Sequence, residues 1–167
     1  MALDLAAFLS SLVQNYGLAG LLFASIIANA SLFLPLPIDI LVFLLGTTKF
    51  FNPFFIAIAA ALGAVVGESV GYVVGLGGHR LIGRVAQESI EKIEEFREKI
   101  KTFGMLFIIG FAFVPFPFDL IGIASGMIKY DWKRFALAVF IGKFFRYTLI
   151  AFAGFYGLEF LAKIFVV

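Results

Sequence analysis

Two stretches of the sequence decide the fold: FLPLPIDILVFLLGTTKF at residues 33–50 and FVPFPFDLIGIASGMIKY at residues 113–130. They are offset by 80 residues, and each contains the pattern Pro-x-Pro-x-Asp, with Gly and Lys following at the same distances. Apolar identities arise by chance in a chain this rich in apolar residues, but four of its five prolines lie in these two patterns. They are Pro35, Pro37, Pro115 and Pro117. We therefore expect an internal repeat.

The composition around these stretches is that of an integral membrane protein. The chain has 167 residues, of which 62% are hydrophobic, 17% aromatic and 14% charged. Soluble domains contain roughly 45–50% apolar and about 25% charged residues. This excludes an ordinary soluble enzyme and a disordered chain. The length fits a single membrane domain over residues 1–167.

Cysteine and histidine usage excludes several kinds of site. The chain has no Cys and one His, so we expect no disulfide, no thiolate metal site and no His-rich zinc site. The formal net charge of +2 is too small to indicate nucleic acid as a partner. No nucleophile–base or metal constellation is visible, so we expect neither an enzyme nor a cofactor.

Segment lengths predict how the chain meets the membrane. Residues 104–114 and 118–128 are apolar, and each would form about 16 Å of helix, too short for a hydrocarbon core of about 30 Å. Broken by two prolines, they predict a re-entrant helix hairpin whose tip carries Pro115 and Pro117. The first copy, with Pro35 and Pro37 at its tip, fits the same interpretation, although residues 17–34 nearly reach spanning length.

Two further segments are long enough to cross. Residues 54–76 and 135–156 are apolar over 22 or 23 residues, where a crossing helix needs about 20. Each repeat then holds one hairpin and one crossing helix, so the second copy is inverted relative to the first. The expected fold is all-α, an inverted repeat of re-entrant hairpin plus transmembrane helix, with repeat 1 at about 17–78 and repeat 2 at about 104–157.

Amphipathic surface helices complete the predicted fold. Residues 1–16 place apolar side chains at near-helical spacing, and their first charge is the acid Asp4, unlike the basic start of a secretory signal. We therefore expect this helix in the mature protein. Residues 79–102 hold most of the chain's charge and an apolar stripe at Ile90, Ile93 and Ile100, which predicts a linker helix on the membrane face.

Lysine and arginine counts predict the orientation. Nine of the cations fall in the linker and in the junction at 129–134: Arg80, Arg84, Lys92, Arg97, Lys99, Lys101, Lys129, Lys133 and Arg134. The positive-inside rule then places the linker in the cytoplasm and both termini outside, in a multi-pass protein of the inner or plasma membrane. If the first hairpin spans instead, the N-terminus lies inside.

Asp39 and Asp119 occupy matching places in the two copies, two residues after the second proline. An acid in the first turn complements the positive end of the helix dipole, which is a structural role. Charges at membrane depth are also costly and usually functional. The pair can therefore be a proton or cation carrier at the hairpin tips, and the two interpretations are compatible.

Glu68, Lys143 and Arg146 are the charges inside the two crossing helices. In antiparallel helices Glu68 and Lys143 share a depth, and Arg146 lies one turn further on the same face as Lys143. One interpretation is a buried ion pair that only joins the repeats. The other is a polar path for an anionic group, in which Glu68 exchanges a proton.

Glycines recur every four residues around Glu68, at positions 63, 67, 71 and 75. This small-xxx-small pattern is typical of a helix face that lets another helix approach closely. We expect a packing role for it.

Several motifs resemble the DedA family, also called VTT or SNARE-associated-Golgi-like proteins, and most closely its short YqaA-like branch. They are Glu68-Ser-Val-Gly-Tyr72, Phe113-Val-Pro115, the segment ending at Gly126, Trp132-Lys-Arg-Phe135 and Gly142-Lys-Phe-Phe-Arg146-Tyr. The resemblance implies paired re-entrant hairpins and transport of lipids such as polyprenyl phosphates or phospholipids, in several members with proton motive force.

The chain departs from the family motif Arg-Phe-x-Pro-x-x-Arg, because Ala112 and Phe118 stand at the two arginine positions. Lys143 and Arg146 are then the cations left to meet a head-group phosphate.

Three functions remain open from the sequence. The leading hypothesis is a lipid flippase or scramblase, with membrane lipids and protons as partners and Asp39, Asp119 and Glu68 as protonatable groups. The second is a proton-coupled exporter of small solutes, and the third a membrane scaffold that transports nothing. A homo-oligomer is compatible with each of them. Neutralising the two aspartates discriminates, because a scaffold should tolerate it.

Overall fold

A computed structural model describes residues 2–31, 38–77, 87–115 and 118–165, and within these ranges the regular structure is helical. The helices run in the order α1 (Ala2–Ala30), α2 (Ile38–Thr47), α3 (Pro53–Leu76), α5 (Gln87–Phe103), α6 (Met105–Phe113), α7 (Asp119–Met127) and α8 (Trp132–Phe165). The predicted all-α class is confirmed.

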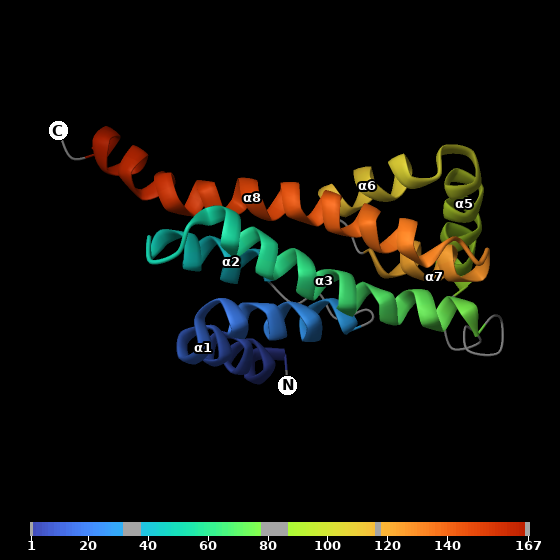
Figure 1. The fold of residues 1–167 in the computed structure, drawn as a ribbon, viewed down its shortest axis with the longest axis horizontal. Helices are drawn as coiled ribbons and strands as arrows, with labels where there is room; N and C mark the ends of the chain where they lie inside the picture. The colour runs from blue at the N-terminus through green and yellow to red at the C-terminus, as the bar shows by residue number, and fades with distance from the viewer. Residues whose placement is uncertain (1, 32–37, 78–86, 116–117, 166–167) are drawn as a thin grey trace.

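The long helices α3 and α8 form the centre of the bundle and lie against each other along its long axis (Figure 1). α3 begins where Asn52 accepts a hydrogen bond from the amide of Phe54 at 2.9 Å, with Pro53 at its first position. Both helices are apolar and long enough to cross a membrane: 24 residues in α3, and 26 in the Trp132–Gly157 part of α8. They correspond to the two crossing segments predicted from the sequence.

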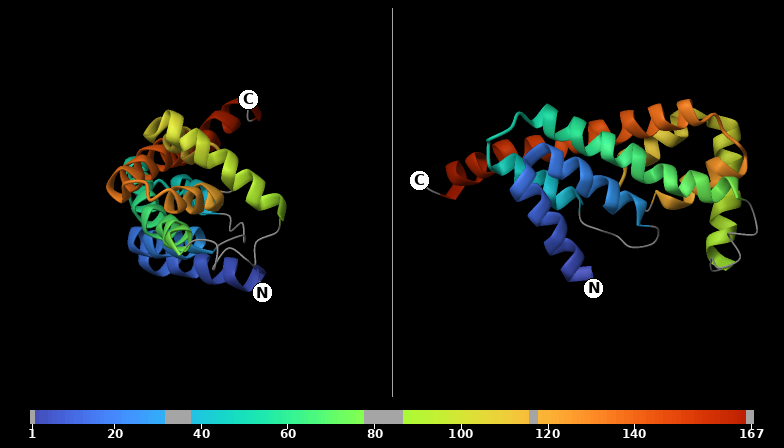
Figure 2. Two further views of the ribbon diagram at one scale, coloured as in Figure 1. Left: turned by 90° about the vertical axis from the view of Figure 1, so that its right-hand side faces the viewer. Right: turned by 60° about the horizontal axis from the view of Figure 1, so that its bottom comes forward.

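α1 is bent at Gly17, where φ is 55° and ψ is −125°. Its stretch Ala7–Ala30 also meets the length and composition of a membrane span. The bend leaves residues 18–30 as the straight part, about 20 Å long, which is less than a hydrocarbon core of about 30 Å. Figure 2 shows the first part of α1 leaving the bundle at a steep angle. The bend at Gly17 therefore coincides with the boundary predicted between residues 1–16 and the segment that follows.

A matching bend separates α5 from α6 at Gly104, with φ 57° and ψ −130°. α5 lies across the end of the bundle opposite the bend at Gly17, and α6 turns from it into the bundle (Figures 1 and 2). A positive φ strains any residue with a Cβ, so glycine is favoured at both bends. The same bend at a glycine with positive φ therefore occurs twice, at opposite ends of the molecule.

The short helices occupy opposite halves of the bundle. α6 and α7 lie in the half near α5, and α2 lies with the second part of α1 in the other half (Figure 1). α3 packs against α1 and α7, and α8 packs against α6 and α2. Each long helix therefore contacts the first short helix of its own half of the sequence and the second short helix of the other half.

Glycines allow these close contacts, as predicted for the stripe in α3. A Cβ on Gly67 would lie 2.7 Å from the Cβ of Asn29 in α1. Further along the stripe, Gly75 faces the carbonyl of Ile123 in α7, and on α8 Gly154 faces the carbonyl of Phe43 in α2. Those two carbonyls are 80 residues apart, the offset of the sequence repeat.

We expect Gly67→Ala to lower the thermal stability of the protein in detergent, because the new methyl group overlaps α1. Overpacking of this kind costs about 1–3 kcal/mol, and the gain of about 1 kcal/mol in helix propensity offsets part of it. Gly110→Ala in α6 is the matched control, since its Cβ would meet no atom within 4 Å. Equal stabilisation by both substitutions, measured as the unfolding midpoint, would rule out the close contact.

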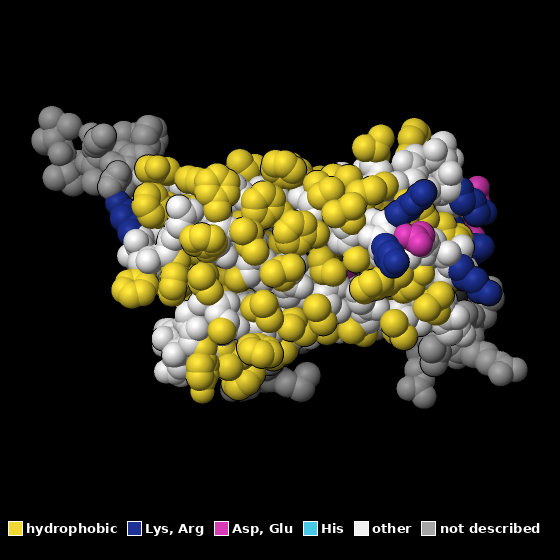
Figure 3. All heavy atoms as spheres, in the orientation of Figure 1, with side chains coloured by type: hydrophobic (Ala, Val, Ile, Leu, Met, Phe, Trp, Pro, Cys, Tyr) yellow, Lys and Arg dark blue, Asp and Glu magenta, His cyan; other side chains and the backbone are white. Residues whose placement is uncertain are grey.

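α5 is the linker helix that the charge pattern predicts over 79–102, and it is described from Gln87 to Phe103. Ile93, Phe96 and Ile100 are buried, and α5 packs on α7. On its outer face a hydrogen bond from Lys101 lowers the pKa of Glu98. Figure 3 shows Lys and Arg side chains gathered at this end of the molecule, while the middle of the same face is mostly hydrophobic.

Candidate functional site

A buried ion pair lies between the two long helices. The Nζ atom of Lys143 on α8 is 2.9 Å from Oε1 of Glu68 on α3, and the side chains are 7% and 4% exposed. The contact predicted from their shared depth is present. A buried pair of this kind is stable only if further hydrogen bonds satisfy both partners.

The second hydrogen bond of Lys143 comes from α1. Nζ donates to Oδ1 of Asn29 at 3.0 Å. The amide nitrogen of Asn29 in turn donates to the carbonyl of Ser25 at 2.7 Å, and the Ser25 hydroxyl donates to the carbonyl of Ala60 at 2.7 Å. Sequence reasoning missed Asn29 as a site residue; the available signal was an amide within an apolar helix.

The ammonium group of Lys143 also lies 5.7 Å from the ring centroid of Phe118, close enough for a cation–π contact. Phe118 stands at one of the two positions where the family motif has arginine. The Lys143 ammonium group therefore lies beside a position at which the motif has an arginine.

A second ion pair joins Arg146 to Asp39. One guanidinium nitrogen of Arg146 binds Oδ2 of Asp39 at the start of α2, and another donates to the carbonyl of Val114 at 3.0 Å. Asp39 and Val114 belong to the two proline-containing stretches, 75 positions apart. Arg146 thus ties both stretches to α8 instead of hydrogen-bonding to Glu68, as the sequence had allowed.

This second pair is more open than the first. The side chain of Asp39 is 35% exposed and that of Arg146 is 13% exposed. Within the described residues, the other carboxylate oxygen of Asp39 is buried and has no hydrogen-bond partner. Asp39 therefore keeps an acceptor that an incoming proton or donor can use.

Of the remaining predicted site residues, the structure describes Asp119 and Pro115. Asp119 is the first residue of α7, matching Asp39 near the start of α2, and it acts electrostatically on Glu68. Pro115 is exposed just after the end of α6. Pro35, Pro37 and Pro117, predicted as hairpin tips, lie outside the described residues.

The polar region also contains a buried phenol. The phenol of Tyr147 is fully buried next to Arg146 in the sequence, and it interacts electrostatically with Lys143 and Asp39. Among the described residues, the hydroxyls of Tyr147, Thr148 and Ser125 have no hydrogen-bond partner. Buried hydroxyls are normally satisfied, so the phenol of Tyr147 keeps a hydrogen bond for a polar group that enters the region of the ion pairs.

An apolar groove of about 410 Å³ runs beside the polar region, between α6 and α8. Its lining residues are Ile109, Gly110, Phe113, Gly142, Phe145, Thr148 and Leu149. Phe145 and Leu149 are 57% and 60% exposed on the outer face of α8. Phe113 of the lining directly precedes Val114, whose carbonyl accepts a hydrogen bond from Arg146, so the groove adjoins the second ion pair.

Metal chemistry finds no support in this region. Within the described ranges, no group of three or more His, Cys, Asp or Glu side chains is placed to hold a metal ion. The charges are arranged as two ion pairs across helices, which suits recognition of charged groups.

Comparisons with known proteins identify the family of the chain. The family model of the VTT domain matches residues 34–156, from the first proline stretch to near the end of the apolar part of α8. A protein of Methanocaldococcus jannaschii, described as uncharacterized, is 28% identical over 146 residues, covering 86% of this chain and 87% of the relative. No solved structure matches the chain. The chain has helices long enough to cross a membrane, and the domain model matches more than half of its length. It therefore belongs to the VTT domain family.

Proposed function

We propose that this VTT domain protein moves lipids across the bilayer, as a flippase or scramblase. The observation that carries the proposal is the polar centre formed by Glu68–Lys143 and Asp39–Arg146 inside an apolar bundle. Charged groups within membrane segments are rare, face the interior of the bundle and mark substrate or ion pathways. The resemblance described above points to the same class of function.

In this proposal the two halves form an inverted repeat, with repeat 1 at about 17–78, the linker at 79–102 and repeat 2 at about 104–157. Three correspondences support it: the bends at Gly17 and Gly104, the crossed packing of α2 and α7 on the opposite long helices, and the matching positive φ at Lys49 and Lys129. The short helices then enter from opposite membrane faces as re-entrant hairpins. Substrate sites in such repeats lie where broken helices meet near the midplane.

Arg146 is the residue that would bind a lipid head group. One nitrogen of its guanidinium now binds a single carboxylate oxygen of Asp39, and a phosphate offers more acceptor oxygens, two of which the planar guanidinium can bind together. A lipid phosphate would therefore exchange with Asp39, while Lys143 adds a second cation one turn away. The apolar groove beside Arg146 would hold an acyl or prenyl chain during this exchange.

Protons would accompany the exchange. Asp39, released from Arg146, has to be solvated or protonated, and Asp119 holds the matching place in the other repeat. Protonation of Glu68 would free Lys143 to face the substrate. These three acids link lipid movement to a proton gradient without any other cofactor, in a multi-pass protein of the cell membrane.

The experiment that tests the proposal uses purified protein in liposomes. A head-group-labelled phospholipid is distributed over both leaflets, and an impermeant quencher reports exchange of the inner pool, with and without a proton gradient. Exchange in both conditions means a scramblase, and exchange only with a gradient means coupled flipping. Folded protein that gives no exchange above protein-free liposomes overturns the proposal in favour of the solute exporter or the scaffold.

The re-entrant topology predicts which side each loop faces. Because the chain has no Cys, single cysteines report accessibility cleanly. We expect Gln14→Cys and Asn52→Cys to react with an impermeant maleimide from one side of the membrane, and Lys101→Cys and Lys133→Cys from the other. If Gln14→Cys and Asn52→Cys are labelled from opposite sides, the first hairpin spans.

A further inference from the structure

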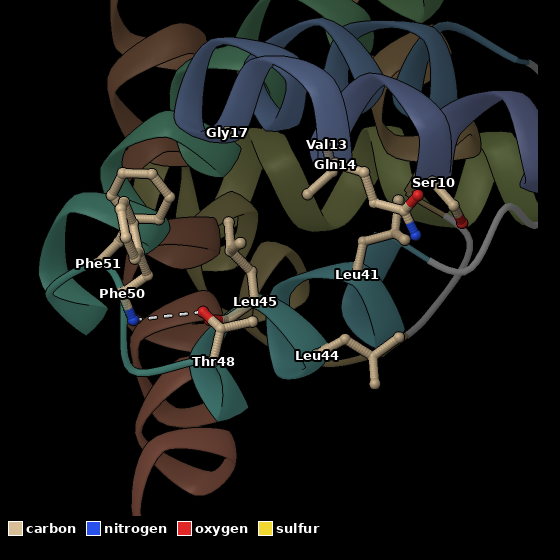
Figure 4. Close-up of a pocket in the computed structure, with 10 residues that line it drawn as sticks. All are labelled: Ser10, Val13, Gln14, Gly17, Leu41, Leu44, Leu45, Thr48, Phe50 and Phe51. Carbon is tan, nitrogen blue, oxygen red and sulfur yellow. Dashed lines mark hydrogen bonds between the residues drawn. The ribbon is translucent and has the colours of Figure 1, made fainter.

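Two cavities of similar size lie at opposite ends of the molecule, away from the polar centre. One, of about 600 Å³, lies where the first part of α1 meets α2 and the loop after it (Figure 4). The other, of about 710 Å³, lies where α5 meets α6 and the loop between α7 and α8. Each opens beside one of the two bent glycines, Gly17 and Gly104.

The two cavities are built from corresponding positions. Around the bends the offset is 87 residues, and around the later loops it is the repeat offset of 80. The corresponding lining residues are Val13 and Ile100, Gln14 and Lys101, Gly17 and Gly104, Thr48 and Ile128, Phe50 and Tyr130, and Phe51 and Asp131. An accidental surface hollow would not recur with this correspondence, so the cavity is a feature of the repeat.

The charge of the lining differs between the two ends. The cavity beside Gly17 is lined by no charged residue, and its polar groups are Ser10, Gln14 and Thr48 (Figure 4). The cavity beside Gly104 is lined by three cations, Lys101, Lys129 and Arg134, and by one acid, Asp131. Of the two corresponding cavities, the one beside Gly104 therefore has positive charge in its lining.

Two of these cations are available to a ligand. Lys101 donates to Glu98 at 2.7 Å, which neutralises part of its charge. Within the described residues, by contrast, the side chains of Lys129 and Arg134 enter no ion pair. Asp131 uses one carboxylate oxygen to accept from the backbone amide of Arg134 at 2.8 Å. The residues that line the cavity therefore carry a net positive charge.

The lining of this cavity also includes apolar side chains. They are Ile100, Met105 and Ile128. Trp132, the chain's single tryptophan, begins α8 next to the cavity and is 50% exposed. Tryptophan in such a position is typical of the membrane–water interface. Cations and apolar side chains that line one cavity match the two parts of a phospholipid that lie at the interface, its phosphate and the start of its acyl chains.

We propose that the cavity beside Gly104 binds the head group of an anionic phospholipid at the membrane surface, separately from any transported lipid. Lys129 and Arg134 bind the phosphate, and Ile100, Met105 and Ile128 cover the glycerol and the first methylenes. This site does not depend on the proposed transport function, because it is defined by binding alone.

Trp132 provides the measurement. The protein is placed in phosphatidylcholine vesicles that contain a rising fraction of a lipid brominated near the carbonyl, either phosphatidylglycerol or phosphatidylcholine, and quenching of Trp132 is recorded. We expect brominated phosphatidylglycerol to quench at a several-fold lower mole fraction. Each of Arg134→Gln and Lys129→Asn should lower its relative association constant by roughly fivefold. Asn tolerates the positive φ of 52° at Lys129.

Lys133→Gln is the matched control, since Lys133 lies in the same turn and carries the same charge without lining the cavity. Near-UV spectra and the unfolding midpoint confirm that each variant folds. Equal quenching by both lipids, or an equal loss with Lys133→Gln, would overturn the proposal in favour of a diffuse surface charge. Displacement of the brominated lipid by millimolar inorganic phosphate would overturn it in favour of a soluble anion.

Discussion

Lys143→Met should lower the free energy of unfolding by about 3–5 kcal/mol, which is the usual loss when one partner of a buried ion pair is removed. The carboxylate of Glu68 is 4% exposed and would lose its ionic partner inside the bundle. Met keeps much of the length and packing of the lysine stem, so the lost charge causes most of the effect. Thermal or denaturant unfolding in detergent gives the measurement.

The double variant Glu68→Gln/Lys143→Met completes a cycle that measures the interaction free energy between the two charges. If the two charges are coupled, the double variant is more stable than the sum of the two single losses implies. Lys133→Met on the exposed first turn of α8 should change stability by less than about 0.5 kcal/mol. Strictly additive losses in the double variant would show that Glu68 and Lys143 do not stabilise each other.

Arg146→Gln should lower the initial rate of lipid movement by about 10–100-fold, since a charge-assisted hydrogen bond to phosphate contributes about 1.5–3 kcal/mol. Arg146→Lys should lie between wild type and Arg146→Gln, because Lys keeps the charge but not the planar fork that binds Asp39 and Val114. The rates are compared at equal protein-to-lipid ratio in the quencher assay.

Lys133→Gln controls for the loss of a positive charge, as Lys133 is exposed at the start of α8 and lines neither the groove nor the end cavity. It should retain the wild-type rate, and the unfolding midpoint of every variant should be measured alongside. An Arg146→Gln protein that folds and still moves lipid at the wild-type rate would remove Arg146 from the pathway and leave it a structural link between the two proline stretches.

The all-α class and the positions of the long helices could be predicted from the sequence, because their signals are local. Segment length and hydropathy locate α3 and α8, and the four prolines in Pro-x-Pro-x-Asp mark the breaks before α2 and α7. The boundary at Gly17 could also be predicted. The helices that contact the glycines of α3 could not be predicted. A stripe of small residues indicates close packing, but it does not show that its first half contacts α1 and its second half α7.

The candidate site could be predicted only where two charges share a depth on helices of known direction. That reasoning paired Glu68 with Lys143. It missed Asp39–Arg146, because the crossed packing of α2 on α8 is set by the whole tertiary arrangement. Asn29 was missed because a single amide in an apolar helix has no partner visible in the sequence.

The paired end cavities carry no motif in the sequence. They arise where a bent glycine turns a surface helix into the bundle, and only the shared backbone angles of Gly17 and Gly104 reveal their relation. Their residues correspond at an offset of 87 in one part and 80 in the other, so a search at a single offset does not align them.

The most direct test of the account compares lipid exchange by wild type and by Asp39→Asn/Asp119→Asn in liposomes, with the head-group label and the proton gradient described above. The account predicts exchange by wild type and its loss in the double variant, with both proteins folded. If wild type gives no more exchange than protein-free liposomes, or the double variant exchanges lipid as fast as wild type, the proposed lipid pathway through the polar centre is contradicted.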